Sequence, residues 1–244
     1  MRTSQRNSFF LVAIVFTTLF FLAILTVIGI VIFNEKTIVV PDEEGTISGA
    51  VAIAEPGDII LVKAKEDGNP YEENVSISTE NIKLVGIGKT QPFVMGDEAN
   101  AITVLDTTGV LVKNFRVQAV GGSGDSGISL NNANHNLIKG NTSNDNDDFG
   151  ITVFDSDFNI IKENILNQNA FGMNITNDSD SNLVKRNVLN DNSDLGISLS
   201  ASSNENSVFF NIAFGNTFDD IQDADDNNFK GNECDNSDPG GLCN

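Results

Sequence analysis

Residues 127–149 read GISLNNANHNLIKGNTSNDNDDF, and residues 150–171 read GITVFDSDFNIIKENILNQNAF. These stretches are two versions of one block, which recurs every 21 to 24 residues toward the C-terminus. A repeat of this length corresponds to one coil of a solenoid. Each block opens with Gly, an apolar residue, any residue and a second apolar residue, at Gly127–Leu130, Gly150–Val153, Gly172–Ile175 and Gly196–Leu199.

The apolar residues of each opening string alternate with small polar ones, which is the period of a strand with one buried face. A second string begins and ends with asparagine and holds one apolar residue at a constant place: Ile138, Ile161, Val184, Val208 and Phe229. Stacking these residues makes an apolar column that no single coil could bury alone. The pattern predicts an all-β fold, a single-stranded parallel β-helix.

The asparagines that close the second string also recur in register. At one coil per ~4.8 Å, their side-chain amides can bond to one another and to the backbone of a buried turn. We therefore predict a structural ladder of Asn141, Asn164, Asn187, Asn211 and Asn232.

Upstream of the regular coils, Ile47, Val51 and Ala54 have helical spacing within Thr46–Glu55, and Pro56-Gly57 ends that stretch. We expect a short helix here that caps the open end of the first coil, because an end strand otherwise exposes unpaired backbone. Strand-like runs follow at residues 59–62, 75–77, 82–85, 102–105 and 110–117.

The N-terminus carries 25 uncharged residues from Phe9 to Phe33. At ~1.5 Å per residue a helix of this length exceeds the ~30 Å hydrocarbon core of a membrane. A cleaved secretory signal would have a shorter apolar run and a small-residue cleavage site, so we expect a retained anchor. Arg2 and Arg6 precede the span, which predicts a cytoplasmic tail (1–8), a single-pass plasma-membrane helix (9–33) and an extracytoplasmic domain (34–244).

The outer domain is strongly acidic, because all 34 acidic residues but only 12 of the 14 basic ones follow residue 34, giving −22. This charge disfavours nucleic acid and anionic membrane surfaces, and it attracts cations and basic partners. Solubility in salty or acidic surroundings is the simpler interpretation.

Two cysteines, Cys234 and Cys243, flank Pro239-Gly240-Gly241 near the C-terminus. Outside the cytoplasm such a pair usually oxidises, so we predict a disulfide. Metal binding by these thiols is not expected, because no further cysteine is available and His135 is the only histidine.

A family resemblance covers residues 37–244. Ile38–Pro41, the expected cap helix, Pro56–Val62 and Tyr71–Val75 resemble the opening of right-handed parallel β-helix proteins of the pectate-lyase-like superfamily. The asparagine-punctuated coils resemble those of the copper-enzyme maturation (NosD-like) proteins in that superfamily. The resemblance implies the right-handed fold, whereas its members range from lyases, hydrolases and epimerases to adhesins and non-enzymatic accessory proteins.

Two groups of charged residues occupy constant repeat positions. Asp155, Asp157, Asp178 and Asp180 are expected to cluster in one turn region, where water or a bridging calcium ion would screen their repulsion. Lys139, Lys162 and Lys185 follow the buried column and should point outward. These lysines either grip a carboxylated sugar or balance their acidic neighbours.

No catalytic residue can be assigned from the sequence. The superfamily's hydrolases share a Gly-His-Gly string and an Arg-x-Lys string, and neither occurs here. We expect a non-catalytic surface module that presents a β-helix face to a polysaccharide, a cell-wall polymer or a protein partner. The alternative is a calcium-dependent lyase or hydrolase acting on acidic glycans; an accessory role like that of the copper-enzyme maturation proteins lacks His and Met clusters.

Overall fold

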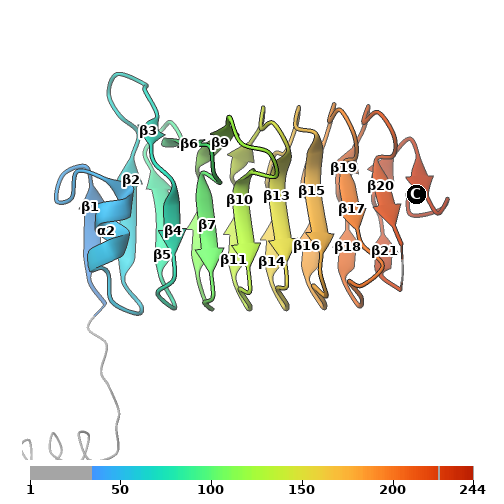
Figure 1. Cartoon of the computed structure of the whole chain (residues 1–244), viewed down its shortest axis with the longest axis horizontal. Helices are drawn as coiled ribbons and strands as arrows, with labels where there is room; N and C mark the ends of the chain where they lie inside the picture. Colours follow the sequence, from blue (N-terminus) through green and yellow to red (C-terminus); the bar gives the residue numbers. More distant parts are fainter. Residues whose placement is uncertain (1–34, 225, 244) are drawn as a thin grey trace, which may run out of the picture. The chain divides into compact units, whose positions relative to one another are not determined.

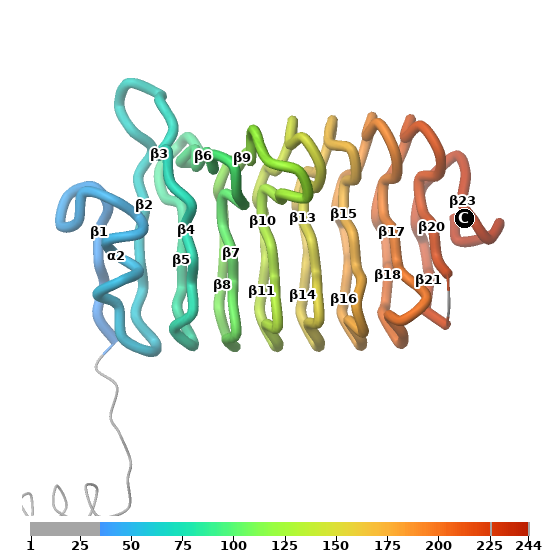
Figure 2. Tube along the Cα trace, in the orientation of Figure 1, coloured from blue at the N-terminus to red at the C-terminus, as the bar shows by residue number. Residues whose placement is uncertain are grey.

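The computed structural model describes residues 35–224 and 226–243. The tail and anchor expected at 1–8 and 9–33 lie outside these residues. In the described part, no helix is both long and apolar enough to cross a membrane. The chain winds through a row of stacked coils, each adding its strands to the same sheets (Figures 1 and 2).

Every strand pairs in parallel with the equivalent strand of the neighbouring coil. A nine-stranded sheet contains, in order, β1 (Thr37–Val40), β2 (Ile59–Lys63), β5 (Lys83–Ile87), β8 (Leu111–Lys113), β11 (Leu137–Lys139), β14 (Ile160–Lys162), β16 (Leu183–Lys185), β18 (Ser207–Phe209) and β21 (Asn228–Lys230). An eight-stranded sheet contains β4 (Val75–Ile77), β7 (Ile102–Leu105), β10 (Ser126–Asn131), β13 (Phe149–Phe154), β15 (Phe171–Thr176), β17 (Ile197–Leu199), β20 (Ile221–Asp223) and β23 (Ser237–Asp238).

The third side is less regular. A four-stranded sheet holds β3 (Tyr71–Glu72), β6 (Phe93–Asp97), β9 (Arg116–Val120) and β12 (Thr142–Ser143), and a two-stranded one holds β19 (Ile212–Ala213) and β22 (Glu233–Cys234). Isolated bridges through Ile165 and Val188 join the two. The result is an all-β, right-handed type of parallel β-helix of about nine coils, the hand that parallel crossovers take.

The predicted register of the Gly-initiated strings is confirmed. Ile128 pairs with Ile151, Ile151 with Met173, and Met173 with Ile197. In the nine-stranded sheet Ile138, Ile161, Val184 and Val208 stack in the same way and are fully buried. One continuous apolar core therefore runs along the described coils.

Three turns close each coil, and we name them from the fifth coil. Turn A (132–136) leads from the eight-stranded to the nine-stranded sheet, turn B (140–141) leads to the third side, and turn C (144–148) leads back. The expected strand at 110–117 is wrong as a single element. Asn114, with φ 64°, is turn B of its coil and separates β8 from β9.

The expected cap helix is present as α2 (Ile47–Ile53) and packs beside β1, β2 and β4. Thr46 is its N-cap, since its side chain accepts a hydrogen bond from the Gly49 N–H. Glu73 accepts two further bonds, from the Ile47 and Ser48 N–H groups. Ile47, Ala50 and Val51 are buried, so the helix covers the apolar end of the first coil.

The asparagine ladder predicted at turn B is formed and is almost completely buried. Each Oδ1 accepts the backbone N–H of the equivalent residue in the preceding coil at 2.9–3.0 Å. Each Nδ2 donates to a main-chain carbonyl of that coil at 2.8–3.1 Å. Two further ladders run in parallel: Asn136, Asn159, Asn182, Asn206 and Asn227 in turn A, and Asn146, Asn169, Asn192 and Asn216 in turn C.

The last coil is closed by a short C-terminal segment. Cys234 and Cys243 form the predicted disulfide, with their Cα atoms 5.5 Å apart. Buried Asp220 ends the turn C ladder, accepting bonds from the Asn216 side chain and from two backbone N–H groups at 235 and 236. Leu242 packs against the core, so the final coil is covered rather than open.

Candidate functional site: a basic edge on an acidic β-helix

The three predicted lysines are brought together in one row. Lys139 pairs with Lys162 and Lys162 with Lys185, while the residue before each is buried, so the lysines point outward. Lys113 of the preceding coil continues the row, because β8 pairs with β11 in the same register. We call Lys113, Lys139, Lys162 and Lys185 the lysine row.

The place of Lys113 in the row could also have been predicted from the sequence, although not from the spacing of the asparagines. Residues 111–113 read LVK, as residues 183–185 do, and the residue two places after Lys113 is Phe115 instead of asparagine. Phe115 occupies the start of the turn B ladder, where its N–H donates to Asn141.

The lysine row belongs to a wider separation of charge. Among the described residues, the strands of the nine-stranded sheet contain seven lysines and no Asp or Glu, whereas those of the other sheets contain one basic residue, Arg116. All basic residues from 35 onward lie in this sheet, in turn B or directly beside one of them: Lys36, Lys63, Lys65, Lys83, Lys89, Lys113, Arg116, Lys139, Lys162, Lys185, Arg186 and Lys230. We call this strip the basic edge.

Few of these cations are neutralised by a direct partner. In the described part of the chain three ion pairs form: Lys63 with Asp42, Lys83 with Glu35, and Lys139 with Glu163 at 3.2 Å. The hydrogen bond from Lys139 is the main cause that lowers the pKa of Glu163; burial opposes it, and the charges of Lys139, Lys162 and Arg186 lower the pKa further. Glu163 therefore pairs with Lys139, whereas Arg186 acts on it through its charge.

An apolar row runs beside the lysines on the same outer face. Leu111, Leu137, Ile160 and Leu183 pair in register two residues before the lysines, and Ile160 is 36% exposed. The face is therefore a strip of ammonium groups next to a strip of aliphatic side chains. Such a surface can hold an anion while it packs against the less polar faces of the same ligand.

The four predicted aspartates lie in turn A. Asp155 and Asp178 are exposed and have left-handed backbone conformations, with φ 47° and 55°. Asp157 and Asp180 form a hydrogen-bonded ladder, in which Asp157 Oδ1 accepts the Asp180 N–H at 2.8 Å and Asp180 Oδ1 accepts the Asn204 N–H. In the described residues no group of three His, Cys, Asp or Glu side chains is placed to hold a metal ion, so calcium at this turn stays a prediction of the sequence.

The aspartates and the lysines do not form one site. Asp157 lies in turn A before β14 and Lys162 is the last residue of β14, so the two lie at opposite ends of this strand. Their Cα atoms are at most ~17 Å apart at ~3.3 Å per residue, and no ion pair joins them in the described structure. Phe154 and Phe158 are exposed at turn A, whereas Phe149 and Phe171 begin β13 and β15 at the turn C end and stack with ring centroids 5.2 Å apart.

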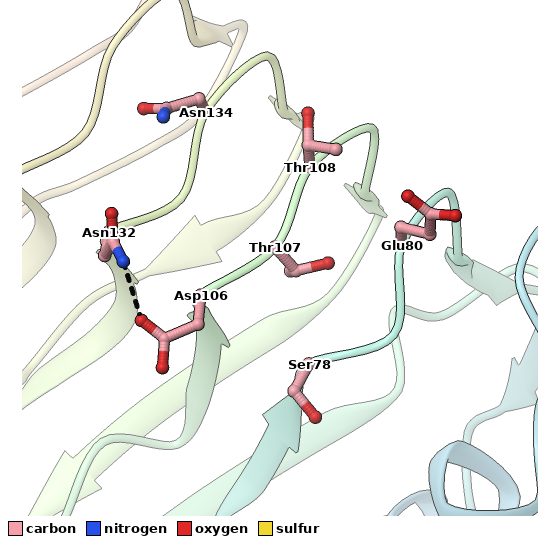
Figure 3. Close-up of a pocket in the computed structure, with 7 residues that line it drawn as sticks. All are labelled: Ser78, Glu80, Asp106, Thr107, Thr108, Asn132 and Asn134. Carbon is pink, nitrogen blue, oxygen red and sulfur yellow. Dashed lines mark hydrogen bonds between the residues drawn. The ribbon is translucent and has the colours of Figure 1, made fainter.

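A polar hollow of about 490 Å³ also opens at turn A of the early coils. Asp106 lies in it and accepts a hydrogen bond from the Asn132 side chain at 2.9 Å, and Glu80 lines the other side (Figure 3). In the part of the chain that the structure describes, its lining contains two carboxylates and no basic residue, so this hollow is distinct from the basic edge.

These features define the class of the protein as a parallel β-helix with a charge-separated surface. A family described as "Periplasmic copper-binding protein (NosD)" matches residues 31–238. The chain belongs to this family, and the domain it forms is accordingly of an extracytoplasmic kind.

Comparison with solved structures agrees on the fold. An alginate lyase from Paenibacillus sp. str. FPU-7 aligns with a TM-score of 0.55 at 15% identity, covering 83% of this chain and 75% of the lyase. Pectate lyase Pel9A aligns with a TM-score of 0.59 at 15% identity, covering 78% of this chain and 56% of that enzyme. At this identity the likeness extends to the fold alone. A search of curated proteins found no match.

The family description names copper, so the side chains that could bind a copper ion in this chain are of interest. His135 is exposed and stacked on Phe158, with ring centroids 5.1 Å apart. Met173 is fully buried in the core, and both cysteines are in the disulfide. Copper prefers soft and imidazole donors. Within residues 35–224 and 226–243 no three His, Cys, Asp or Glu side chains are gathered into a metal site.

Proposed function

We propose that this protein is a membrane-anchored, extracytoplasmic and non-catalytic β-helix module that binds an acidic polysaccharide along its basic edge. The observation that carries the proposal is the separation of charge. Lysines that served only to balance the carboxylates would lie among them and pair with them. Instead the basic residues gather on one sheet and its turn B, and few of them have a carboxylate partner in the described structure.

The geometry of the lysine row favours a linear polymer over a compact anion. Parallel coils place equivalent side chains ~4.8 Å apart, so the row presents one ammonium group per coil in a straight line. A polyuronate carries one carboxylate per sugar along an extended chain, at a comparable spacing. The adjacent aliphatic row offers apolar contact to the sugar rings.

An acidic protein binds a polyanion only where short-range attraction outweighs the long-range repulsion between the polyanion and the whole domain. Salt screens that repulsion over roughly 8–10 Å, whereas contacts with the lysines are made at shorter distances. We therefore expect binding to depend on the lysine row itself and to be tolerant of moderate salt.

The absence of catalysis is part of the proposal. A lyase must neutralise the substrate carboxylate and place a base beside the adjacent carbon. The lysines of the row and the aspartates of turn A occupy opposite ends of the strands in the nine-stranded sheet, which keeps these two roles apart.

The test measures binding of the full chain, in detergent, to pectate and alginate, with neutral dextran as the comparison polymer. The variant Lys113→Gln, Lys139→Gln, Lys162→Gln should bind both polyanions about tenfold more weakly, since three exposed ion pairs contribute roughly 0.5 kcal/mol each. A matched control adds three negative charges to the eight-stranded sheet through Asn174→Asp, Thr176→Glu and Gln222→Glu.

Both variants change the net charge by the same amount. If the two lose affinity equally, net charge alone governs binding and the lysine row is not the site. Release of unsaturated or new reducing ends from either polymer, with or without calcium, would contradict the non-catalytic assignment.

A further inference from the structure

Turn B changes in character along the solenoid. From the fourth coil onward the turns at 114–115, 140–141, 163–164 and 186–187 are two residues long. In the second and third coils turn B expands into the loops 64–70 and 88–92. The loop between β2 and β3 projects beyond the turns of the later coils (Figure 1).

These two loops enclose a hollow at the N-terminal end of the lysine row. Cavities of about 250 Å³ and 440 Å³ adjoin there, because Ala64, Lys65, Glu66 and Thr90 line both of them. β2 and β5 precede β8 in the nine-stranded sheet, so the hollow lies just before Lys113 in the order of the coils. A polymer lying along the row toward the N-terminus reaches the hollow and then the projecting loop.

The lining of the hollow is rich in cations that are held in place. The Arg116 guanidinium lies over the Phe93 ring, 4.2 Å from its centroid. Lys65 Nζ lies 4.7 Å from the centre of the Tyr71 ring and donates to the Pro70 carbonyl at 2.7 Å. Lys89 also lines the hollow, and none of these three cations has a carboxylate within ion-pair distance in the described structure.

The loops that form the hollow are fixed to the coils. Gln91 Nε2 donates to the Gly140 carbonyl two coils ahead, and the Arg116 N–H donates to the Pro92 carbonyl at 3.0 Å. Gly86 has no room for a side chain, since a Cβ there would lie 2.1 Å from the Asn114 carbonyl oxygen and 2.7 Å from Pro92. The 88–92 loop is thereby held directly against the backbone.

We propose that this hollow, the end pocket, holds the carboxylated terminal sugar of the acidic chain whose interior lies along the lysine row. The proposal rests on the proposed function and adds a chain end as the recognised feature. Arg116 presents a planar fork that suits one carboxylate, Lys65 lines the same cavity, and Lys89 lines the adjoining one. Among the described residues Glu66 is the single carboxylate lining the hollow, which gives their side chains an excess of positive charge there.

The test uses hexamers of galacturonate with either unmodified ends, a bulky label on the reducing end, or a cap on the non-reducing end. Binding to the full chain in detergent should fall at least tenfold for one of the two modified hexamers and be unchanged for the other. Equal binding of all three hexamers would overturn the end pocket.

Arg116→Ala should weaken the unmodified hexamer about tenfold and remove the discrimination between modified ends. Arg186→Ala is the matched control, since Arg186 is an exposed arginine in turn B of a later coil, and it should leave the discrimination intact. Arg116→Lys keeps the charge and the stem, so it should recover part of the affinity; unchanged melting temperatures would show that all three variants fold.

The outcomes separate the two proposals. If long pectate and the hexamers all fail to bind the wild type, the proposed function is wrong and the end pocket falls with it. If pectate binds through the lysine row while Arg116→Ala and Arg186→Ala behave alike, only the end pocket is wrong.

Discussion

The buried asparagine ladder at turn B makes a quantitative prediction for Asn187→Leu. Asn187 is fully buried, and its Oδ1 accepts the Asn164 N–H at 3.0 Å and the Asn164 Nδ2 at 3.0 Å. Its Nδ2 donates to the Ile161 carbonyl and to Asn211 Oδ1. Replacing Asn187 by leucine, which has a similar size, removes all four hydrogen bonds.

The cost comes mainly from the main-chain groups that lose a partner. A buried donor or acceptor left unsatisfied costs ~1–3 kcal/mol. The Asn164 N–H and the Ile161 carbonyl both lose a bond, whereas Asn164 Nδ2 keeps its bond to the Ile138 carbonyl and Asn211 Oδ1 still accepts the Asn187 N–H. For these two groups the expected loss of unfolding free energy is about 2–6 kcal/mol.

Asn190→Leu is the matched control in the same coil. Asn190 Oδ1 accepts the Phe214 N–H at 2.9 Å, but Asn190 is only half-buried, so water can replace it. This change should cost less than ~1 kcal/mol. Urea unfolding of the full chain, followed by far-UV circular dichroism, gives both values. Equal losses for the two variants would refute the idea that burial of the ladder determines its contribution.

Two further predictions concern the ends and the turns of the coils. Burial, followed by the charge of Asp148, raises the pKa of Asp125, whose Oδ2 has no hydrogen-bond partner in the described structure. Because the pKa of Asp125 is higher in the native state, protonation of its carboxyl favours the native state below the pKa of the unfolded chain (~3.9), and this advantage is lost as the pH rises through the native pKa. Asp125→Asn should therefore raise the melting temperature near pH 7 and not near pH 3. A difference in melting temperature that does not depend on pH would contradict this. Replacing Cys234 and Cys243 by serine should lower the free energy of unfolding by about 2 kcal/mol, because the loop that the disulfide closes is short. It should also speed hydrogen exchange in the last coil. Two alkylatable thiols in the native wild type would show that the disulfide does not form.

The regular coils were predictable from the sequence because one physical requirement repeats in each. A buried turn needs a side-chain partner for its backbone, so asparagine recurs at a fixed distance from the apolar residues that fill the core. That coupling fixed the register from Gly127 onward, and Ile128, Ile151 and Met173 pair as expected.

The early coils were harder to predict from the sequence because their turn B varies in length. The loops 64–70 and 88–92 have no counterpart in later coils, so the distance between equivalent strands changes there. In the sequence, residues 110–117 resemble one strand because they are rich in apolar residues. Val110, Val112, Phe115 and Val117 are indeed all buried, but Asn114 turns the chain between the two pairs. The gathering of basic residues was invisible for the same reason, since Lys65 and Lys89 belong to the basic edge only once those loops are placed.

The in-register stacking has a consequence for how such a protein can change over generations. Equivalent ladder residues in the regular coils are 23 or 24 positions apart, and each bonds in the same way to the coil before it. Duplicating the segment 159–181 would therefore insert one more coil with intact ladders, a filled core and one additional lysine in line with Lys139 and Lys162. The number of coils can therefore grow or shrink in whole units, and the length of the lysine row changes by one residue with each coil.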